Sequence, residues 1–320
     1  MPSDALPVFT VDEFRRVHRL LAARVAHMMG RKFEEGDWAD AYCSAKGIPK
    51  AGWSNLNIDI MHQNLGVEHK MLCRPSDRAL TTWCGTSLMH PVATRAIRID
   101  SLERDANDVM RDVFRQYAEL IGRRSDKVRQ NAGGKDPNMR TGWLLWQESL
   151  REFLYFEEPM VAPDPSRYRA VWSERTTTGA RLGSKNLWIY DKNTDEKKFS
   201  VTTQAGIKIQ PYFRVPAHDD PNLYLFIVQG EFLGDGFVRV WVTAPTAREL
   251  ESLLGGLDPG KVSAAILQAK PQTGIDAIDA ELQDVTELQV SADAYAKLVK
   301  DFEGVSDEQR FRLLVTSLHA

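Results

Sequence analysis

The sequence predicts an α/β protein whose core is a mixed β-sheet flanked by helices, with a β-rich second half and a helical C-terminus. Three observations support this fold class. Apolar residues recur at helical spacing in residues 10–45 and 101–123. Short strand-like segments, each bounded by Gly, Pro, Asn or Asp, follow residue 166. Residues 260–320 are acidic and have the pattern of two or three helices, which we expect to serve in packing or dimer contacts.

Residues 10–45 are expected to form two helices. Thr10 and Glu13 are spaced as a capping box, in which each side chain accepts a hydrogen bond from the other residue's backbone N–H. Gly30 and Gly36 are expected to separate the two helices. The apolar stripe of the first helix consists of Phe14, Val17, Leu21, Val25 and Met28.

Residues 57–72 are predicted to form a β-hairpin, and they say more about function than the rest of the chain. Two short strands flank a turn at residues 63–66, where Asn64 and Gly66 tolerate a left-handed backbone. We expect His62 to pair with Val67 across this turn. A surface hairpin with ordinary polar alternation is the plainer interpretation.

The expected pairing places three ionisable side chains on one side of the hairpin. Asp59 would lie opposite Lys70, and Glu68 shares a face with Lys70 because side chains alternate along a strand. Two carboxylates and one ammonium would then converge on one patch. Oxygen ligands suit Mg²⁺, which lowers the pKa of bound water and offsets phosphate charge. A lysine beside the metal can orient or deprotonate the attacking water. The side chain of His69 should point to the opposite face.

The middle of the chain is predicted to contain a strand at 83–88, a helix at 101–123 and an aromatic helix at 143–156. Residues 123–140 are polar and rich in loop formers, and we expect a loop there. Residues 111–140 carry eight basic and four acidic residues, so this segment either orders on DNA or is an ordinary solvated connection. The candidate phosphate contacts are Arg123, Arg124, Lys127 and Arg140.

The segment 159–165 is proline-rich and is the best candidate for a linker. The expected division is residues 1–160, with the helices and hairpin, then a β-rich region at 166–256, then an acidic helical region at 257–320. The β-rich region is either a separate DNA-reading domain or a continuation of the first sheet. Its expected strands are 187–190, 199–203, 207–215, 223–228 and 238–243. Thr246 and Glu249 are predicted to cap a helix that ends at Gly255.

The segment 175–185 offers three further basic residues, which lie either in a DNA groove or in a solvated loop. Arginine can bond guanine bidentately in such a groove. The segment does not match a phosphate-binding loop, because its glycine spacing is one residue short and Ser precedes Lys. No nucleotide cofactor is therefore expected. The three residues are Arg175, Arg181 and Lys185.

Composition is typical of a globular protein, at 43% hydrophobic and 27% charged residues. No apolar run is long enough to cross a membrane, and no signal peptide is predicted. The three cysteines include no C-x-x-C pair, which fits a reducing cytoplasm. The net charge is −3, but residues 243–320 hold seven basic and thirteen acidic residues. The first 242 residues therefore carry a small positive balance, which suits local contact with phosphates.

The hairpin resembles the active-site motif of the PD-(D/E)XK nuclease superfamily, and within it the type II restriction endonucleases. The matching residues are Asp59, then eight residues, then Glu68-His69-Lys70. Ile58 stands where the family usually has proline. The resemblance implies a restriction-endonuclease-like core in which Asp59 and Glu68 bind Mg²⁺ and Lys70 acts on the water. Members often supply a further acid from a preceding helix, for which Glu35 is the candidate.

The resemblance implies sequence-specific cleavage of double-stranded DNA in a bacterial defence setting, with a homodimer cutting both strands of a palindromic site. A second copy of the motif, Asp191 with Glu196 and Lys198, lies in a charged, turn-prone run and fits less well. Two other classes of function stay open. One is a non-catalytic DNA-binding or regulatory protein of a defence system. The other is a DNA-independent enzyme or interaction protein whose acidic C-terminal helices contact a protein partner.

Overall fold

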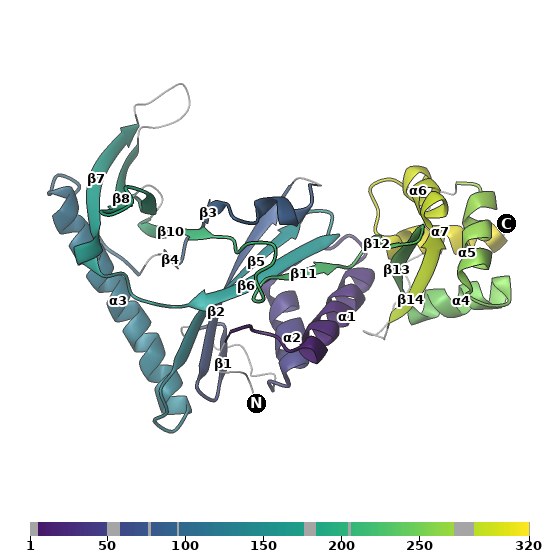
Figure 1. The fold of residues 1–320 in the computed structure, drawn as a ribbon, viewed down its shortest axis with the longest axis horizontal. Helices are drawn as coiled ribbons and strands as arrows, with labels where there is room; N and C mark the ends of the chain where they lie inside the picture. The colour runs from purple at the N-terminus through teal and green to yellow at the C-terminus, as the bar shows by residue number, and fades with distance from the viewer. Residues whose placement is uncertain are drawn as a thin grey trace.

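The computed structural model describes residues 6–49, 58–75, 78–94, 96–175, 184–203, 206–271 and 285–319. Within these ranges the chain is a mixed α/β protein with seven α-helices and three mostly antiparallel sheets, and its C-terminus is helical (Figure 1). The predicted fold class is confirmed at this level. None of the described helices is both long and apolar enough to cross a lipid bilayer.

The first sheet has the strand order β1-β2-β5-β6-β11. Strands β2 and β5 run parallel and the other neighbours are antiparallel, so the sheet is mixed, as expected. The strands are β1 (Ile60–His62), β2 (Leu65–Arg74), β5 (Asn138–Gln147), β6 (Glu152–Pro159) and β11 (Tyr224–Ile227).

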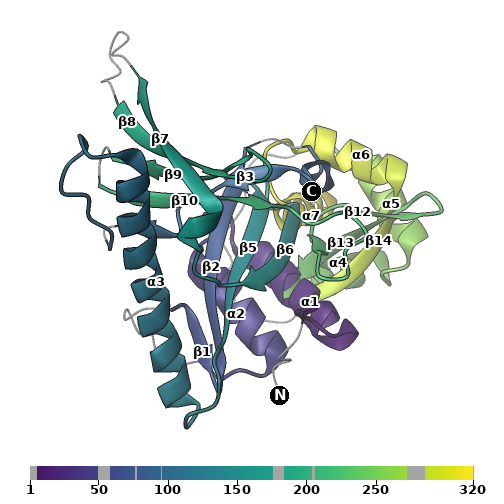
Figure 2. The ribbon, with the colours of Figure 1, turned by 60° about the vertical axis from the view of Figure 1, so that its left-hand side comes forward.

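Helices cover both faces of this sheet. Helices α1 (Val11–His27) and α2 (Glu35–Lys46) bury one face, where Val67 and Leu144 pack. The long helix α3 (Ala106–Asn131) runs beside β1 and β2 on the other face (Figure 2). The capping box of Thr10 and Glu13 is present at the start of α1, as predicted. Because both faces are covered, β5 is buried along most of its length.

The second sheet has the order β3-β10-β9-β8-β7, and β4 also pairs with β10. It packs on the α3 side of the first sheet, where the rings of Trp143 and Phe213 stack with centroids 3.7 Å apart. Its strands are β3 (Ser87–Met89), β4 (Ala93–Thr94), β7 (Tyr168–Arg175), β8 (Ser184–Asp191), β9 (Lys197–Thr202) and β10 (Lys208–Arg214).

The third sheet, β12-β13-β14, forms a C-terminal unit with four helices and its own apolar core. Buried Asp307 joins this unit to the chain leaving the first sheet, because its carboxylate accepts a hydrogen bond from the backbone N–H of Gly230 at 2.9 Å. The elements are β12 (Glu231–Gly234), β13 (Phe237–Thr243), α4 (Ala244–Leu254), α5 (Pro259–Gln268), β14 (Val285–Ser291), α6 (Ala292–Asp301) and α7 (Asp307–His319).

The five strands predicted in the second half all occur, as β8, β9, β10, β11 and β13. The aromatic helix predicted at 143–156 is wrong, since these residues belong to strands β5 and β6. The loop predicted at 123–140 is also wrong in its first part, because α3 continues to Asn131. Instead of the strand predicted at 83–88, the 3₁₀-helix η1 (Leu80–Trp83) precedes the short β3.

Two smaller predictions differ from the structure. Gly30, with a φ of +84°, lies between the first two helices, but Gly36 lies inside α2. Helix α4 begins at Ala244, so Thr246 is within it and donates to the buried carboxylate of Glu308 instead of forming a cap. The helix ends at Gly255, as predicted.

The sheets do not divide at the expected linker. Strands β3 and β4, which precede residue 159, belong to the second sheet. Strand β11, which follows residue 165, returns to the edge of the first sheet beside β6. The C-terminal unit begins with β12 at Glu231, earlier than the expected boundary at 257. The β-rich region therefore supplies one strand to the first sheet and most of the second sheet.

Candidate functional site

The hairpin has a tighter turn than the sequence suggested. His62 pairs with Leu65 and Ile60 pairs with Val67, so the expected His62–Val67 pairing is wrong by two residues. Gln63 takes the left-handed conformation, with a φ of +52°. Asp59 comes directly before β1, and continuing this register brings it opposite Glu68 instead of Lys70.

The three predicted catalytic groups nevertheless lie together. The backbone N–H of His69 donates to Oδ2 of Asp59 at 2.6 Å, and Nζ of Lys70 donates to Oε1 of Glu68 at 2.7 Å. Burial and the nearby carboxylates of Glu68 and Glu35 raise the pKa of Asp59 to about 7. Glu35, at the start of α2, lies near enough for its charge to act on Asp59, and its role as an accessory acid stays a prediction.

A fourth charged group reaches this cluster from α3. Nη2 of Arg124 donates to Oε1 of Glu68 at 3.1 Å, so one carboxylate oxygen accepts from two cationic side chains. Burial raises the pKa of Tyr117, about two turns before Arg124 on the same face of α3, to about 12, with the charges of Arg124 and Glu68 acting on it as well. The sequence predicts a loop at Arg124, and this contact was therefore not expected.

Gly66 explains how α3 comes so close to the hairpin. A Cβ atom on Gly66 would lie 2.8 Å from Cγ2 of Val128 and 2.8 Å from Cδ1 of Ile58. Real Cβ contacts are not that short, so any larger residue here would force neighbouring side chains to shift, and glycine allows the close approach. The glycine predicted to serve the turn therefore serves the packing of α3 against β2, which in turn places Arg124 beside Glu68.

His69 points to the opposite face, as predicted, and enters a buried polar network. Its Nε2 lies 3.1 Å from the hydroxyl of Tyr155, which donates to Glu157 at 2.7 Å. The hydroxyl of Tyr42 donates to the same oxygen of Glu157 at 2.9 Å. Burial lowers the pKa of His69 to about 3, so its imidazole is neutral at physiological pH. No local sequence pattern predicts this network, because it joins segments that are far apart in the chain.

Arg140 belongs to the same network and is buried. The residue is 3% exposed, and its Nη1 donates to Oε2 of Glu157 at 3.1 Å. The predicted role of Arg140 as a phosphate contact is therefore corrected to that of a buried ion-pair partner. A buried carboxylate is usually paired in this way because an unpaired charge is costly in the interior.

The other predicted DNA contacts lie in different settings. Arg123 is exposed and Lys127 is partly exposed on α3, and neither forms an ion pair with the described residues. Lys185 forms ion pairs with Glu103 at 3.2 Å and with Glu174 at 3.4 Å, so its charge is already compensated. Arg175 is the last residue of β7. Arg181 lies outside the described residues.

The second copy of the motif is not assembled as a site. The carboxylate of Asp191 accepts hydrogen bonds from the backbone N–H groups of Asn193 and Thr194, so it stabilises the turn between β8 and β9. Glu196 and Lys198 pair with each other on the surface. This copy lacks the buried third partner that Arg124 provides at the hairpin.

The donor set of the hairpin fits Mg²⁺ but supplies few ligands. Over the described residues, no group of three or more His, Cys, Asp or Glu side chains is arranged to hold a metal. Mg²⁺ commonly takes one or two carboxylates and completes its shell with water and phosphate. Within the described ranges, hydrogen bonds reach Oδ2 of Asp59 and Oε1 of Glu68 but not their other carboxylate oxygens. Among the described residues, no hydrogen-bond donor competes with a cation for these other two oxygens.

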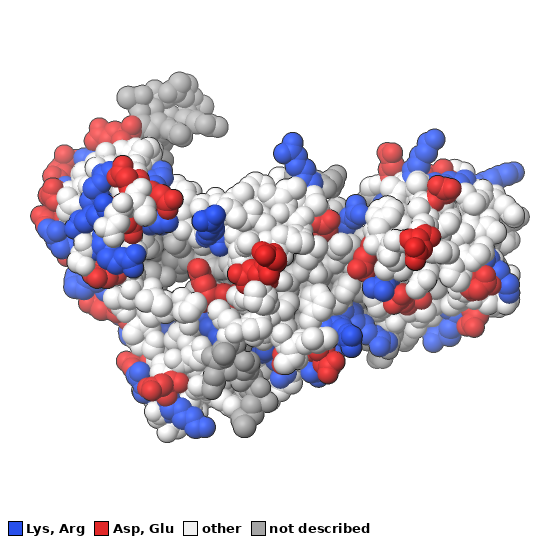
Figure 3. Space-filling model, in the orientation of Figure 1, with Lys and Arg blue, Asp and Glu red and all other residues white. Residues whose placement is uncertain are grey.

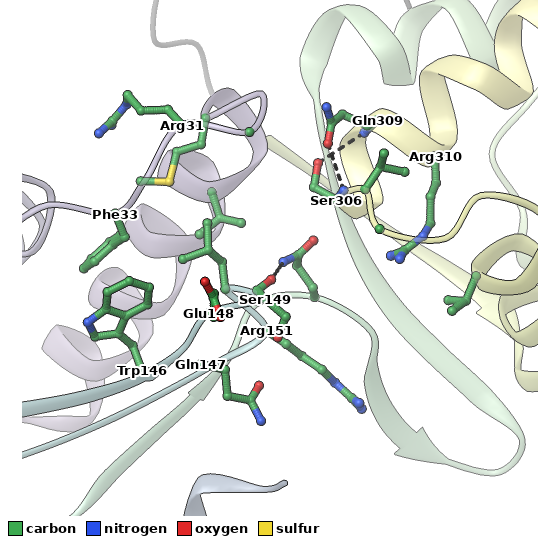
Figure 4. Close-up of a pocket in the computed structure, with 18 of the residues that line it drawn as sticks. Arg31, Phe33, Trp146, Gln147, Glu148, Ser149, Arg151, Ser306, Gln309 and Arg310 are labelled. Carbon is green, nitrogen blue, oxygen red and sulfur yellow. Dashed lines mark hydrogen bonds between the residues drawn. The ribbon is translucent and has the colours of Figure 1, made fainter. Parts of the chain in front are cut away.

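A cavity lies elsewhere, between the first sheet and the C-terminal unit (Figure 4). It has a volume of about 1220 Å³ and is lined by residues including Phe33, Trp146 and Arg310. Cys73, in its wall, is five residues along β2 from Glu68, which is roughly 16 Å at the rise of a strand. Arg310 donates to Asp307 at 2.8 Å, so its charge is already compensated. The cavity is thus separate from the carboxylate cluster.

Charges of both signs mix on the side of the molecule where α3 and β7 lie (Figure 3). Many are compensated along α3, as in the pairs of Arg104 with Asp112 and of Arg115 with Glu119. Comparisons with protein-family models, curated proteins and solved structures found no match to this chain. Function is therefore inferred from the geometry of the cluster.

Proposed function

We propose that this protein is a Mg²⁺-dependent endonuclease that hydrolyses phosphodiester bonds of double-stranded DNA, in the manner of a type II restriction enzyme. The observation that carries the proposal is the convergence of Asp59, Glu68 and Lys70 at the hairpin, where Glu68 is buried, Lys70 is half-buried and Asp59 is exposed. These residue types match the motif. The hydrogen bonds of Asp59 with His69 and of Glu68 with Lys70 hold the three side chains together in the folded chain.

Asp59 and Glu68 would hold the cation through their open carboxylate oxygens. When bound, Mg²⁺ lowers the pKa of a coordinated water and offsets negative charge on the phosphate. Lys70 lies beside Glu68, where its ammonium can orient the attacking water and stabilise charge that develops on the phosphate. The backbone N–H of His69 fixes the carboxylate of Asp59 relative to that lysine.

The DNA backbone would approach along α3. Arg123 and Lys127 present cationic side chains there without ion-pair partners among the described residues, and Arg124 of the same helix reaches the cluster. Phosphate contacts of this kind position the duplex without reading its sequence. Two parts of the proposal come from the resemblance to type II restriction endonucleases. They are sequence-specific cleavage and the action of a homodimer on a palindromic site.

Cleavage of phage or plasmid DNA tests the proposal directly. Purified protein with Mg²⁺ is expected to give discrete fragments, and Glu68→Ala and Lys70→Ala are expected to give none. The matched controls are Glu196→Ala and Lys198→Ala, which alter the same motif on the surface and should leave cleavage unchanged.

Two results would contradict the proposal. DNA that is retarded on a gel but never cut would indicate a non-catalytic DNA-binding or regulatory protein. Cutting that persists in Glu68→Ala and Lys70→Ala but disappears in the control variants would move the site to the second copy of the motif.

A further inference from the structure

Building on the proposed nuclease function, we propose that Arg124 couples the binding of DNA to the binding of a divalent cation. Its guanidinium bonds the carboxylate of Glu68, which the cation also requires, and it can release that carboxylate for a DNA phosphate. The free protein would then bind the cation weakly, and DNA would strengthen that binding.

The contacts of Glu68 motivate this proposal. Its Oε1 accepts from Lys70 at 2.7 Å and from Arg124 at 3.1 Å. The side chains of Glu68, Lys70 and Arg124 are only 10%, 16% and 12% exposed, so solvent screens their charges weakly. These two cationic groups compete with a divalent cation for the same carboxylate.

Arg124 is the partner that can leave. Lys70 belongs to the same strand as Glu68 and projects from the same face, whereas Arg124 reaches across from α3. The Nε of Arg124 is buried and has no hydrogen-bond partner among the described residues. A phosphate oxygen would satisfy this donor, because the planar guanidinium binds phosphate through two parallel N–H groups.

The position of Arg124 on the helix supports the exchange. Arg123 precedes it, and Lys127 follows almost one turn later, so a DNA backbone held by these residues brings phosphates to Arg124. Once Arg124 binds phosphate, Lys70 is the one cationic partner of Glu68 that remains among the described residues. Because linkage is reciprocal, the cation must then strengthen the binding of DNA by the same factor as DNA strengthens that of the cation.

The simplest other role for Arg124 is a structural tether between α3 and β2. The two roles predict opposite effects of removing the charge. Loss of a tether would loosen the cluster and weaken cation binding by the free protein. Loss of a competing charge would strengthen cation binding and abolish its dependence on DNA.

Titration of Mn²⁺ against the full-length protein, followed by electron paramagnetic resonance, distinguishes these roles without any cleavage assay. Arg124→Met keeps much of the aliphatic stem and is expected to bind Mn²⁺ about tenfold more tightly than wild type, a factor within the usual range of coupling. Adding sonicated phage DNA should tighten Mn²⁺ binding by wild type and leave the variant unchanged. Arg124→Lys, which retains the charge, should resemble wild type.

Arg123→Met is the matched control, since it removes an exposed charge from the neighbouring residue. It should weaken DNA binding but leave the Mn²⁺ affinity of the free protein unchanged. Weaker or unchanged Mn²⁺ binding by Arg124→Met would overturn the coupling while leaving the nuclease proposal intact. Wild-type protein that binds no Mn²⁺, with or without DNA, would overturn the nuclease proposal and the coupling together.

Discussion

Asp59 and His69 are joined by a short hydrogen bond, in which the backbone N–H of His69 donates to Oδ2 of Asp59 at 2.6 Å. This bond ties the carboxylate to the backbone between Glu68 and Lys70. The carboxylate of Asp59 is therefore held by the backbone of β2 as well as by the pairing of β1 with β2. This explains why the cluster forms even though the hairpin register differs from the expected one by two residues.

Asp59→Asn should separate cation binding from DNA binding. The amide keeps an oxygen that can accept from His69, but it removes the charge that would hold a cation. We expect cleavage to fall by on the order of 10²–10⁴-fold, with DNA affinity in EDTA preserved. Gel retardation and a cleavage time course measure the two effects. A variant that cuts at the wild-type rate would remove Asp59 from the site.

Gly142→Ala should destabilise the protein. A Cβ atom there would collide with the Tyr155 hydroxyl and would lie 2.7 Å from Cδ2 of His69. Overpacking of a buried site typically costs about 1–3 kcal/mol in the free energy of unfolding. The control is Gly122→Ala in α3, where a Cβ meets open space and the helix should gain about 0.5–1 kcal/mol. Urea denaturation of both variants tests the pair, and equal effects would contradict the close packing.

Arg140→Met should reduce stability rather than DNA affinity. Its removal leaves the buried carboxylate of Glu157 without its cationic partner, which typically costs about 3–5 kcal/mol. Arg123→Met, on the surface of α3, should change the free energy of unfolding by less than about 0.5 kcal/mol. Thermal unfolding compares the two. A stable Arg140→Met protein with weakened DNA binding would restore the original prediction of a phosphate contact.

The salt dependence of DNA binding tests the surface of α3. If Arg123 and Lys127 each neutralise one phosphate, changing each to Ala should lower the slope of log affinity against log salt by about 1. Fluorescence anisotropy with a labelled duplex over a range of NaCl concentrations gives this slope. Lys185→Ala is the comparison, because that lysine is already paired with Glu103 and Glu174 and should change the slope little.

Acid should weaken the start of α2 through Asp37. Burial raises the pKa of Asp37, but hydrogen bonds from Arg31 and from the backbone N–H of Glu34 outweigh it and hold the pKa below its usual value. A carboxyl group with a lower pKa in the folded state adds stability above about pH 4, and this stability is lost as the pH falls through the folded-state pKa. Arg31→Met should therefore lower stability at pH 7 and have less effect near pH 2. A constant difference between wild type and variant, measured by urea denaturation, would contradict this role.

Local signals predicted the elements that depend on local chemistry. The capping box at Thr10 and the stripe from Phe14 to Met28 gave the first helix, and Gly255 gave the end of α4. The spacing of Asp59, Glu68 and Lys70 predicted that these three side chains lie together. The hairpin register was missed because Gly66 was assigned to the turn, whereas the close approach of Val128 requires it. That contact lies between segments more than 60 residues apart, so no local pattern could reveal it.

Long-range packing explains the larger errors. Trp143 and Leu145 face one core cluster and Leu144 faces the other, so β5 lacks the polar alternation that marks a strand. Arg124 was placed in a loop because charged residues crowd the last turns of α3, yet one face of those turns packs on the hairpin. The network of His69, Tyr155 and Glu157 depends on pairing between β2, β5 and β6, which the sequence does not specify.

The return of β11 to the first sheet has a consequence for synthesis of the protein. Until residues 224–227 have been synthesised, no strand is present to pair with the outer edge of β6, and its unpaired backbone groups can recruit other chains. Phe226 then fills the space between β6 and α1. A nascent chain halted before this point would expose an aggregation-prone edge, so the hairpin should acquire its final surroundings only after two-thirds of translation is complete.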